Sequence, residues 1–224
     1  MSNLQPVLDF LVHLSGNNNK AWFDAHREQY DSARALFEDL VMDVIMGLSA
    51  FEPVGGLTPK DCMYRINRDI RFSKDKTPYK DSMSASFTPG GKHAVRAGYY
   101  LHISPGNSFL GGGAWQPSKE QLALIRADIA GGAPELKRVV AAKDFKKTFG
   151  ELSGEKLKVA PKGYPKDHPE IEWLKLQSLT VGHRLSDEDA CKRNLDQRVV
   201  KVFAAMKPFL DYINAVCKDA PGAS

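Results

Sequence analysis

Cysteine is scarce in this 224-residue chain, and the common metal and nucleophile patterns are missing. Cys62, Cys191 and Cys217 are widely spaced and form no Cys-x-x-Cys pair, so we expect no disulfide framework and a reducing compartment. The six histidines are scattered along the chain, and no two lie within one helical turn, so no metal site of the zinc type is predicted. The sequence also contains no His-Glu-x-x-His, Gly-x-Ser-x-Gly or Gly-x-Gly-x-x-Gly segment.

Long apolar runs are absent as well. The first residues carry neither the basic nor the apolar part of a signal peptide, and no segment has the length of a membrane span, so we expect a cytoplasmic protein without a membrane partner. The net charge of +4 is only mildly basic. Asp61, Asp69 and Asp75 are the one carboxylate cluster, and the many cations around them oppose binding of a divalent metal. The sequence assigns no cofactor and no oligomeric state.

What the sequence does contain is one dense basic segment, residues 61–80. Its cations are Arg65, Arg68, Arg71, Lys74, Lys76 and Lys80, and its anions between positions 65 and 80 are Asp69 and Asp75. Six cations minus two anions give +4, which equals the net charge of the whole chain. Because the rest of the chain sums to zero, the positive field is local and predicts a negatively charged partner.

Arg68 is the residue of this segment that most needs a partner. The alternation of apolar and polar residues predicts a strand over residues 67–72, followed by a basic loop, because Pro78 opposes a helix. In a strand Arg68 would share the apolar face, and a buried cation left unpaired costs roughly 3–5 kcal/mol. We therefore expect a carboxylate or an anionic ligand beside it. A purely structural alternative is that the arginines and aspartates form salt bridges and the lysines lie in a solvated loop.

The remaining pattern indicates a single α+β domain over residues 1–224, in which an antiparallel sheet from the middle of the chain is packed by long N- and C-terminal helices. The predicted strands are residues 82–87, 95–104 and 108–115, with a weaker strand at 178–184. The predicted long helices are residues 20–50 and 195–217. Residues 150–168 are expected to form a long basic loop, and residues 220–224 a frayed tail.

Two features of the predicted sheet bear on function. One of its faces is expected to gather Arg65, Arg71, Arg96, Tyr100 and His102, which together would suit an oxyanion or a phosphate. The run Gly111–Gly113 would let a ligand approach the backbone, or else marks a bulge or a close helix crossing, and we favour the latter pair.

The leading functional hypothesis is a site that binds, and acts on, a phosphorylated or carboxylated small molecule. The predicted anion-binding residues are Arg65, Arg68, Arg71, Lys76, Tyr79 and Arg96. In catalysis, Asp69 would orient an arginine or act as a base, and His102 would supply general acid–base chemistry because imidazole titrates near neutrality.

Two other hypotheses stay open. In the first, the same basic segment binds nucleic acid, with Tyr79, Tyr99 or Tyr100 stacking on bases, although the modest net charge favours this less. In the second, the protein is structural or binds a protein partner, and the arginines and aspartates form an internal network of salt bridges.

The basic segment also resembles a known family. Arg65 to Tyr79 reads Arg-x-x-Arg-Asp-x-Arg-Phe-x-x-Asp-Lys-x-x-Tyr, which is similar to the signature of a widespread bacterial family of conserved hypothetical proteins, the domain-of-unknown-function family 2461. The likeness extends to Asn-Asn-Lys-x-Trp-Phe near the start and to Pro105–Phe109, Lys162–Tyr164 and Asp167–Pro169. The resemblance implies membership over nearly the full length, but it supplies no activity and no catalytic residue.

Overall fold

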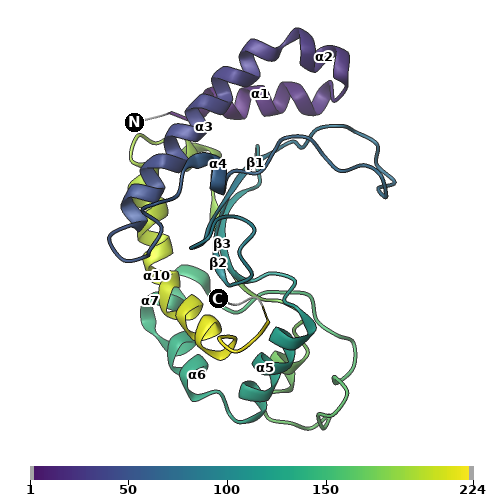
Figure 1. Ribbon diagram of the computed structural model, residues 1–224, viewed down its shortest axis with the longest axis vertical. Helices are drawn as coiled ribbons and strands as arrows, with labels where there is room; N and C mark the ends of the chain where they lie inside the picture. The colour runs from purple at the N-terminus through teal and green to yellow at the C-terminus, as the bar shows by residue number, and fades with distance from the viewer. Residues whose placement is uncertain (1–2, 222–224) are drawn as a thin grey trace. The chain divides into compact units, whose positions relative to one another are not determined.

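Helices and one four-stranded antiparallel sheet make up the protein in the computed structural model, which describes residues 3–221 (Figure 1). The strands are β1 (Met83–Phe87), β2 (Gly98–Ile103), β3 (Ser108–Ala114) and β4 (Leu179–Leu185). They lie side by side in the order β1-β2-β3-β4. The predicted α+β class is therefore confirmed. Four of the five predicted strands are present, within three residues at either end.

Helices lie before, between and after these strands. Of the two longest helices, one lies before the sheet in the sequence and the other after it. The helices before the sheet are α1 (Gln5–Gly16), α2 (Lys20–Ala25), α3 (Arg27–Leu48) and α4 (Pro59–Cys62). Those between β3 and β4 are α5 (Lys119–Ala130), α6 (Pro134–Ala141), α7 (Lys143–Phe149) and α8 (Ile171–Leu174). After β4 come α9 (Asp187–Ala190) and α10 (Leu195–Val216). None of the helices within residues 3–221 combines the length and the apolarity needed to cross a membrane.

The prediction of one continuous helix over residues 20–50 is wrong, because the chain breaks at His26. The backbone of His26 leaves helical geometry, with φ −113° and ψ 24°. Its imidazole stacks on the ring of Trp22 at 4.0 Å, and Nδ1 lies 2.8 Å from the Trp22 carbonyl oxygen. These contacts close α2 at its C-terminal end, and α3 begins at the next residue.

The predicted strand over residues 67–72 is also wrong. Instead of pairing with the sheet, the segment folds back on itself, and Asn67 forms an isolated antiparallel bridge with Tyr79. The Arg68 N–H donates to the Pro78 carbonyl at 2.9 Å, and the Lys80 N–H donates to the Ile66 carbonyl at 2.8 Å. Residues 67–79, called the basic loop from here on, therefore form their own closed turn, drawn in blue beside β1 in Figure 1.

The chain divides into two compact units. The first comprises Met1–Lys92, Tyr100–Leu110 and Arg184–Lys201, and the second comprises His93–Tyr99, Gly111–His183 and Val202–Ser224. In the first unit α3 contacts α1 and β1, and its apolar face includes the fully buried Phe37, Val41 and Val44. Strands β2, β3 and β4 and helix α10 contribute residues to both units, and the single-domain organisation stays a prediction.

The glycine run serves packing in the second unit. A side chain at Gly112 would overlap the Met206 sulfur on α10 and would lie 2.8 Å from the Gly98 carbonyl oxygen. Gly113 adopts φ +128°, which disfavours other residues, and a Cβ there would lie 2.8 Å from Thr180 Cα. Of the two favoured interpretations, a bulge or a close helix crossing, these contacts bear out the helix crossing. Residues 150–168 form the predicted loop. Two isolated β-bridges hold its backbone, one between Ser153 and Thr180 and one between Lys156 and Leu176. Of the predicted frayed tail, residues 222–224 lie outside the described residues.

Candidate functional site

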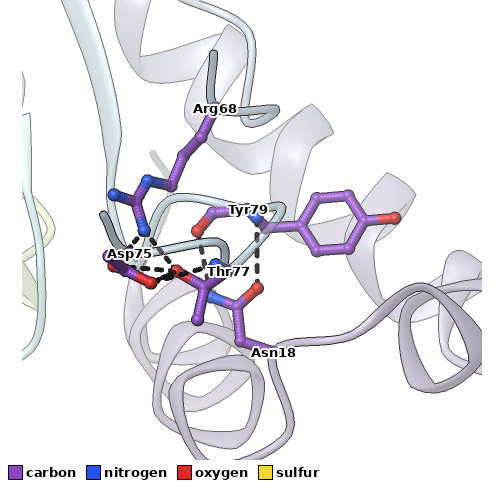
Figure 2. A network of polar contacts seen from close by, with 5 residues as sticks. All are labelled: Asn18, Arg68, Asp75, Thr77 and Tyr79. Atoms are coloured by element: carbon purple, nitrogen blue, oxygen red, sulfur yellow. Dashed lines mark hydrogen bonds and ion pairs between the residues drawn. The ribbon is translucent and has the colours of Figure 1, made fainter. Parts of the chain in front are cut away.

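The root of the basic loop is tied to the turn between α1 and α2 by one side chain. The Asn18 Nδ2 donates to the Tyr79 carbonyl at 2.9 Å, and Asn18 Oδ1 accepts from the Tyr79 N–H at 3.1 Å (Figure 2). The Tyr79 ring points away from Arg68 in Figure 2 and stacks on Phe23 at 4.0 Å. With 6% of Tyr79 exposed, its ring anchors the loop.

Arg68 has a carboxylate partner, which is one of the two alternatives that the sequence predicted, and this partner lies within the loop. Its Nη1 forms an ion pair with Asp75 and donates to the Thr77 hydroxyl (Figure 2). Asp75 also accepts from the Thr77 N–H at 2.9 Å. The Thr77 N–H first, and then the Arg68 guanidinium, lowers the pKa of Asp75 to about 2. The side chain of Arg68 is 26% exposed, so part of its guanidinium still reaches solvent.

A second pair within the loop fixes Arg71. Its Nε and Nη2 bind the two oxygens of Asp69 at 2.9 and 2.7 Å, a bidentate arrangement. The hydrogen bond from Arg71 lowers the pKa of Asp69, which makes this carboxylate a weaker base. The geometry fits the orienting role predicted for Asp69. Nearby, Lys76 Nζ donates to the Ile70 carbonyl at 2.9 Å.

A polar pocket of about 470 Å³ lies in the first unit, at the root of the basic loop. Hydroxyl groups in its lining come from Ser15, Thr77 and Ser82. Its charged groups are the Arg68–Asp75 pair, Lys80 and Asp81. Because the pocket combines cations, carboxylates and hydroxyl groups, it is suited to a small molecule that is itself polar.

Lys80 is the unusual group of this pocket. Its side chain is half-buried, yet within residues 3–221 its Nζ makes no hydrogen bond and no ion pair. It lies 5.6 Å from the centroid of the Tyr64 ring, a cation–π distance. Burial first, and the charge of Arg65 second, lowers the pKa of Lys80. Sequence reasoning missed this position because Lys80 looked like any other lysine of the basic segment.

His102 lies on β2, on the sheet face that carries Tyr100. The Tyr100 hydroxyl is 3.2 Å from His102 Nδ1, and the imidazole stacks on Phe109 at 4.9 Å. Burial lowers the pKa of His102; among the charges, Asp81 opposes that shift and Lys80 adds to it. The imidazole is therefore neutral near pH 7 and able to accept a proton. Because Lys80 and Asp81 line the pocket, the electrostatics of His102 and the pocket are linked.

Contrary to what the sequence had suggested, the other predicted site residues do not all lie on one face of the sheet. Arg65 is exposed and, like Arg71, belongs to no strand, so the predicted gathering of arginines on one sheet face is wrong for these two. Arg96 precedes β2 and belongs to the second unit. The sheet face does bring Tyr100 and His102 together. The assignment of catalytic and anion-binding roles stays a prediction.

Residues that could hold a metal or act as a nucleophile do not assemble here. Within residues 3–221, no three His, Cys, Asp or Glu side chains form a group that could bind a metal ion. Cys62 is buried in α4, and burial first, with the charge of Asp61 second, raises its pKa to about 11. Its thiol is therefore protonated and unreactive near neutral pH.

Together, the fold and the site define an α+β protein with a polar pocket, lined by cations and carboxylates, beside an internally braced basic loop. The chain belongs to the family described as conserved hypothetical protein (DUF2461), which matches residues 6–212. The family predicted from the sequence is therefore confirmed. Comparisons with curated proteins and with solved structures gave no match.

Proposed function

We propose that the first compact unit binds a phosphorylated or carboxylated small molecule in the polar pocket, with Lys80 holding the anionic group. The observation that carries this proposal is the half-buried ammonium of Lys80, which has no hydrogen bond or ion pair within the described part of the chain. Taking a cation out of water without a partner is unfavourable. An anionic ligand would offset this desolvation and raise the lowered pKa of Lys80 again.

The rest of the lining supports a ligand with one anionic group and several hydroxyl groups. Within residues 3–221, the bonds of the Arg68 guanidinium, to Asp75 and Thr77, use Nη1, which leaves Nε and Nη2 for a second oxygen of the ligand. Ser15, Ser82 and the Asp81 carboxylate suit hydroxyl groups of the ligand as hydrogen-bond partners. Because Asp81 would repel a second strong anion, hydroxylated monophosphates and hydroxycarboxylates fit better than polyanions.

A reaction at this site in addition to binding would require a proton acceptor, and His102, which lies outside the pocket lining, is the candidate. Its neutral imidazole can accept a proton near pH 7, and Lys80 and Asp81 couple it electrostatically to the pocket. In this proposal His102 is the acid–base group, and Asp69 orients Arg71.

The proposal is tested by calorimetric titration with inorganic phosphate, sugar monophosphates and hydroxycarboxylates. Lys80→Gln removes the charge of Lys80 with little change in length. Lys74→Gln is the matched control, because Lys74 is exposed and lies outside the pocket lining. A charge-assisted hydrogen bond contributes about 1.5–3 kcal/mol, so we expect Lys80→Gln to weaken binding by about ten- to a hundredfold.

Two further results complete this test. Binding to the wild-type protein should weaken as the pH rises through the lowered pKa of Lys80, because only the ammonium attracts the anion. Equal affinity of the wild-type protein and Lys80→Gln for every compound that binds would contradict the proposal, and so would failure of the whole panel to bind.

A further inference from the structure

Phe72 is the most exposed large apolar residue of the described chain, with 95% of its surface in solvent. It lies midway along the basic loop, and its ring contact within residues 3–221 is the guanidinium of Arg71, 5.9 Å from the ring centroid. Of the tyrosines that the sequence suggested for stacking on bases, Tyr79 and Tyr99 are buried. Tyr100 is half-buried, and Tyr64 of the basic segment is 36% exposed, so Phe72 is the most exposed aromatic ring that the segment offers to a partner.

The loop that carries Phe72 is braced from within. The bridge between Asn67 and Tyr79 closes its root, and the Arg68–Asp75 pair spans its interior. Lys76 holds the Ile70 carbonyl at 2.9 Å, close to the tip. A ring on a preorganised loop loses little conformational freedom when a partner covers it, which favours binding.

The ion pairs that brace the basic loop do not neutralise all of its cations, nor the preceding Arg65. Both carboxylates, Asp69 and Asp75, are occupied by Arg71 and Arg68. Three cations therefore keep no ion pair within the described residues: Arg65, Lys74 and Lys76. The hydrogen bond of Lys76 to a neutral carbonyl does not compensate its charge. A fully exposed aromatic ring is thus accompanied by three uncompensated positive charges.

We propose that the basic loop docks on single-stranded nucleic acid. Phe72 stacks on an unpaired base, and Arg65, Lys74 and Lys76 contact the neighbouring phosphates. This combination of one π-face with several cations is how proteins hold single strands without reading their sequence. An anionic membrane surface is the less suitable partner, because its binding scales with buried apolar area and Phe72 is flanked by Arg71 and Ser73. The surface is distinct from the pocket, whose lining does not include these four residues.

The test is fluorescence anisotropy with labelled oligothymidylate and the full chain. Stacking of one base predicts that Phe72→Ala weakens binding by about five- to a hundredfold. Trp115→Ala is the matched control, because Trp115 is another exposed aromatic residue, 68% accessible, in the second unit. Contact with three phosphates predicts that the logarithm of the binding constant falls with the logarithm of the salt concentration with a slope of about −2.

The outcomes separate this proposal from its rivals. Lys74→Gln should weaken oligothymidylate binding and lower the salt slope by about 0.7, although it leaves binding of small anions in the pocket unchanged. Equal binding by Phe72→Ala and the wild-type protein, or no binding at all, overturns the proposal. Binding of the wild-type protein to phosphatidylserine vesicles but not to oligothymidylate overturns it in favour of a membrane surface. Because Phe72 is uncovered, Phe72→Ala should fold as the wild type does, and a thermal melt verifies this.

Discussion

Replacing Asn18 by alanine should destabilise the first compact unit, because this side chain connects the basic loop to the turn between α1 and α2 with two hydrogen bonds. The bonds join the Asn18 amide to the Tyr79 carbonyl at 2.9 Å and to the Tyr79 N–H at 3.1 Å. Each contributes about 0.5–1.5 kcal/mol net, so losing both lowers the free energy of unfolding by about 1–3 kcal/mol. Asn18 also lines the pocket, where water can reach the freed groups of Tyr79, which favours the lower half of this range.

The assay is equilibrium urea denaturation followed by circular dichroism and tryptophan fluorescence. The midpoint should fall while the slope of the free energy against urea stays unchanged, because the surface exposed on unfolding is the same. Asn107→Ala is the control, since Asn107 is exposed and its side chain makes no hydrogen bond within residues 3–221. A loss for Asn18→Ala no larger than the loss for Asn107→Ala would refute the view that this amide holds the loop.

Two further predictions concern backbone space and titration. Gly113→Ala should lower the free energy of unfolding by about 1–3 kcal/mol, because φ is +128° and the new methyl group would overlap the Leu179 carbonyl oxygen. Gly16→Ala is the control: its methyl group would meet no atom within 4 Å, so the melting temperature should stay equal or rise. The Asp75 carboxyl should titrate in a ¹³C NMR experiment near pH 2 instead of its ordinary 3.8, and Arg68→Ala should raise its pKa only in part, because the Thr77 N–H is the larger cause. The stability that ionised Asp75 contributes is thus present above about pH 4 and is lost as the pH falls towards 2.

The parts of the fold that were predictable from the sequence are those in which local pattern and tertiary environment agree. Alternation of apolar and polar residues identified β1, and the stripe from Val199 to Ile213 identified α10. The break at His26 was not predictable, because the apolar spacing continues through it from α2 into α3. It depends on the stacking of the imidazole on Trp22, which periodicity does not encode.

The candidate site, too, was predictable from the sequence only in part. The local charge excess located the basic loop, and the argument from desolvation predicted that Arg68 needs a carboxylate or an anionic ligand. The sequence could not tell that Asp75, seven residues away, supplies it, because the pattern over residues 67–72 also fits a strand. The special position of Lys80 was hidden as well, since its unpaired state follows from how Tyr64 and the pocket surround it.

The contact between Asn18 and Tyr79 has a consequence for the order of folding. It joins residues that are 61 positions apart in the sequence. Forming this contact therefore costs the conformational entropy of closing a 61-residue segment of chain. Bonds inside the basic loop are far more local, spanning two to ten residues, and can form early. We therefore expect a nascent chain to shape the turn first and to fix it in place last, when α1 and α2 have docked. Removal of the first helices would then leave a formed but unanchored loop.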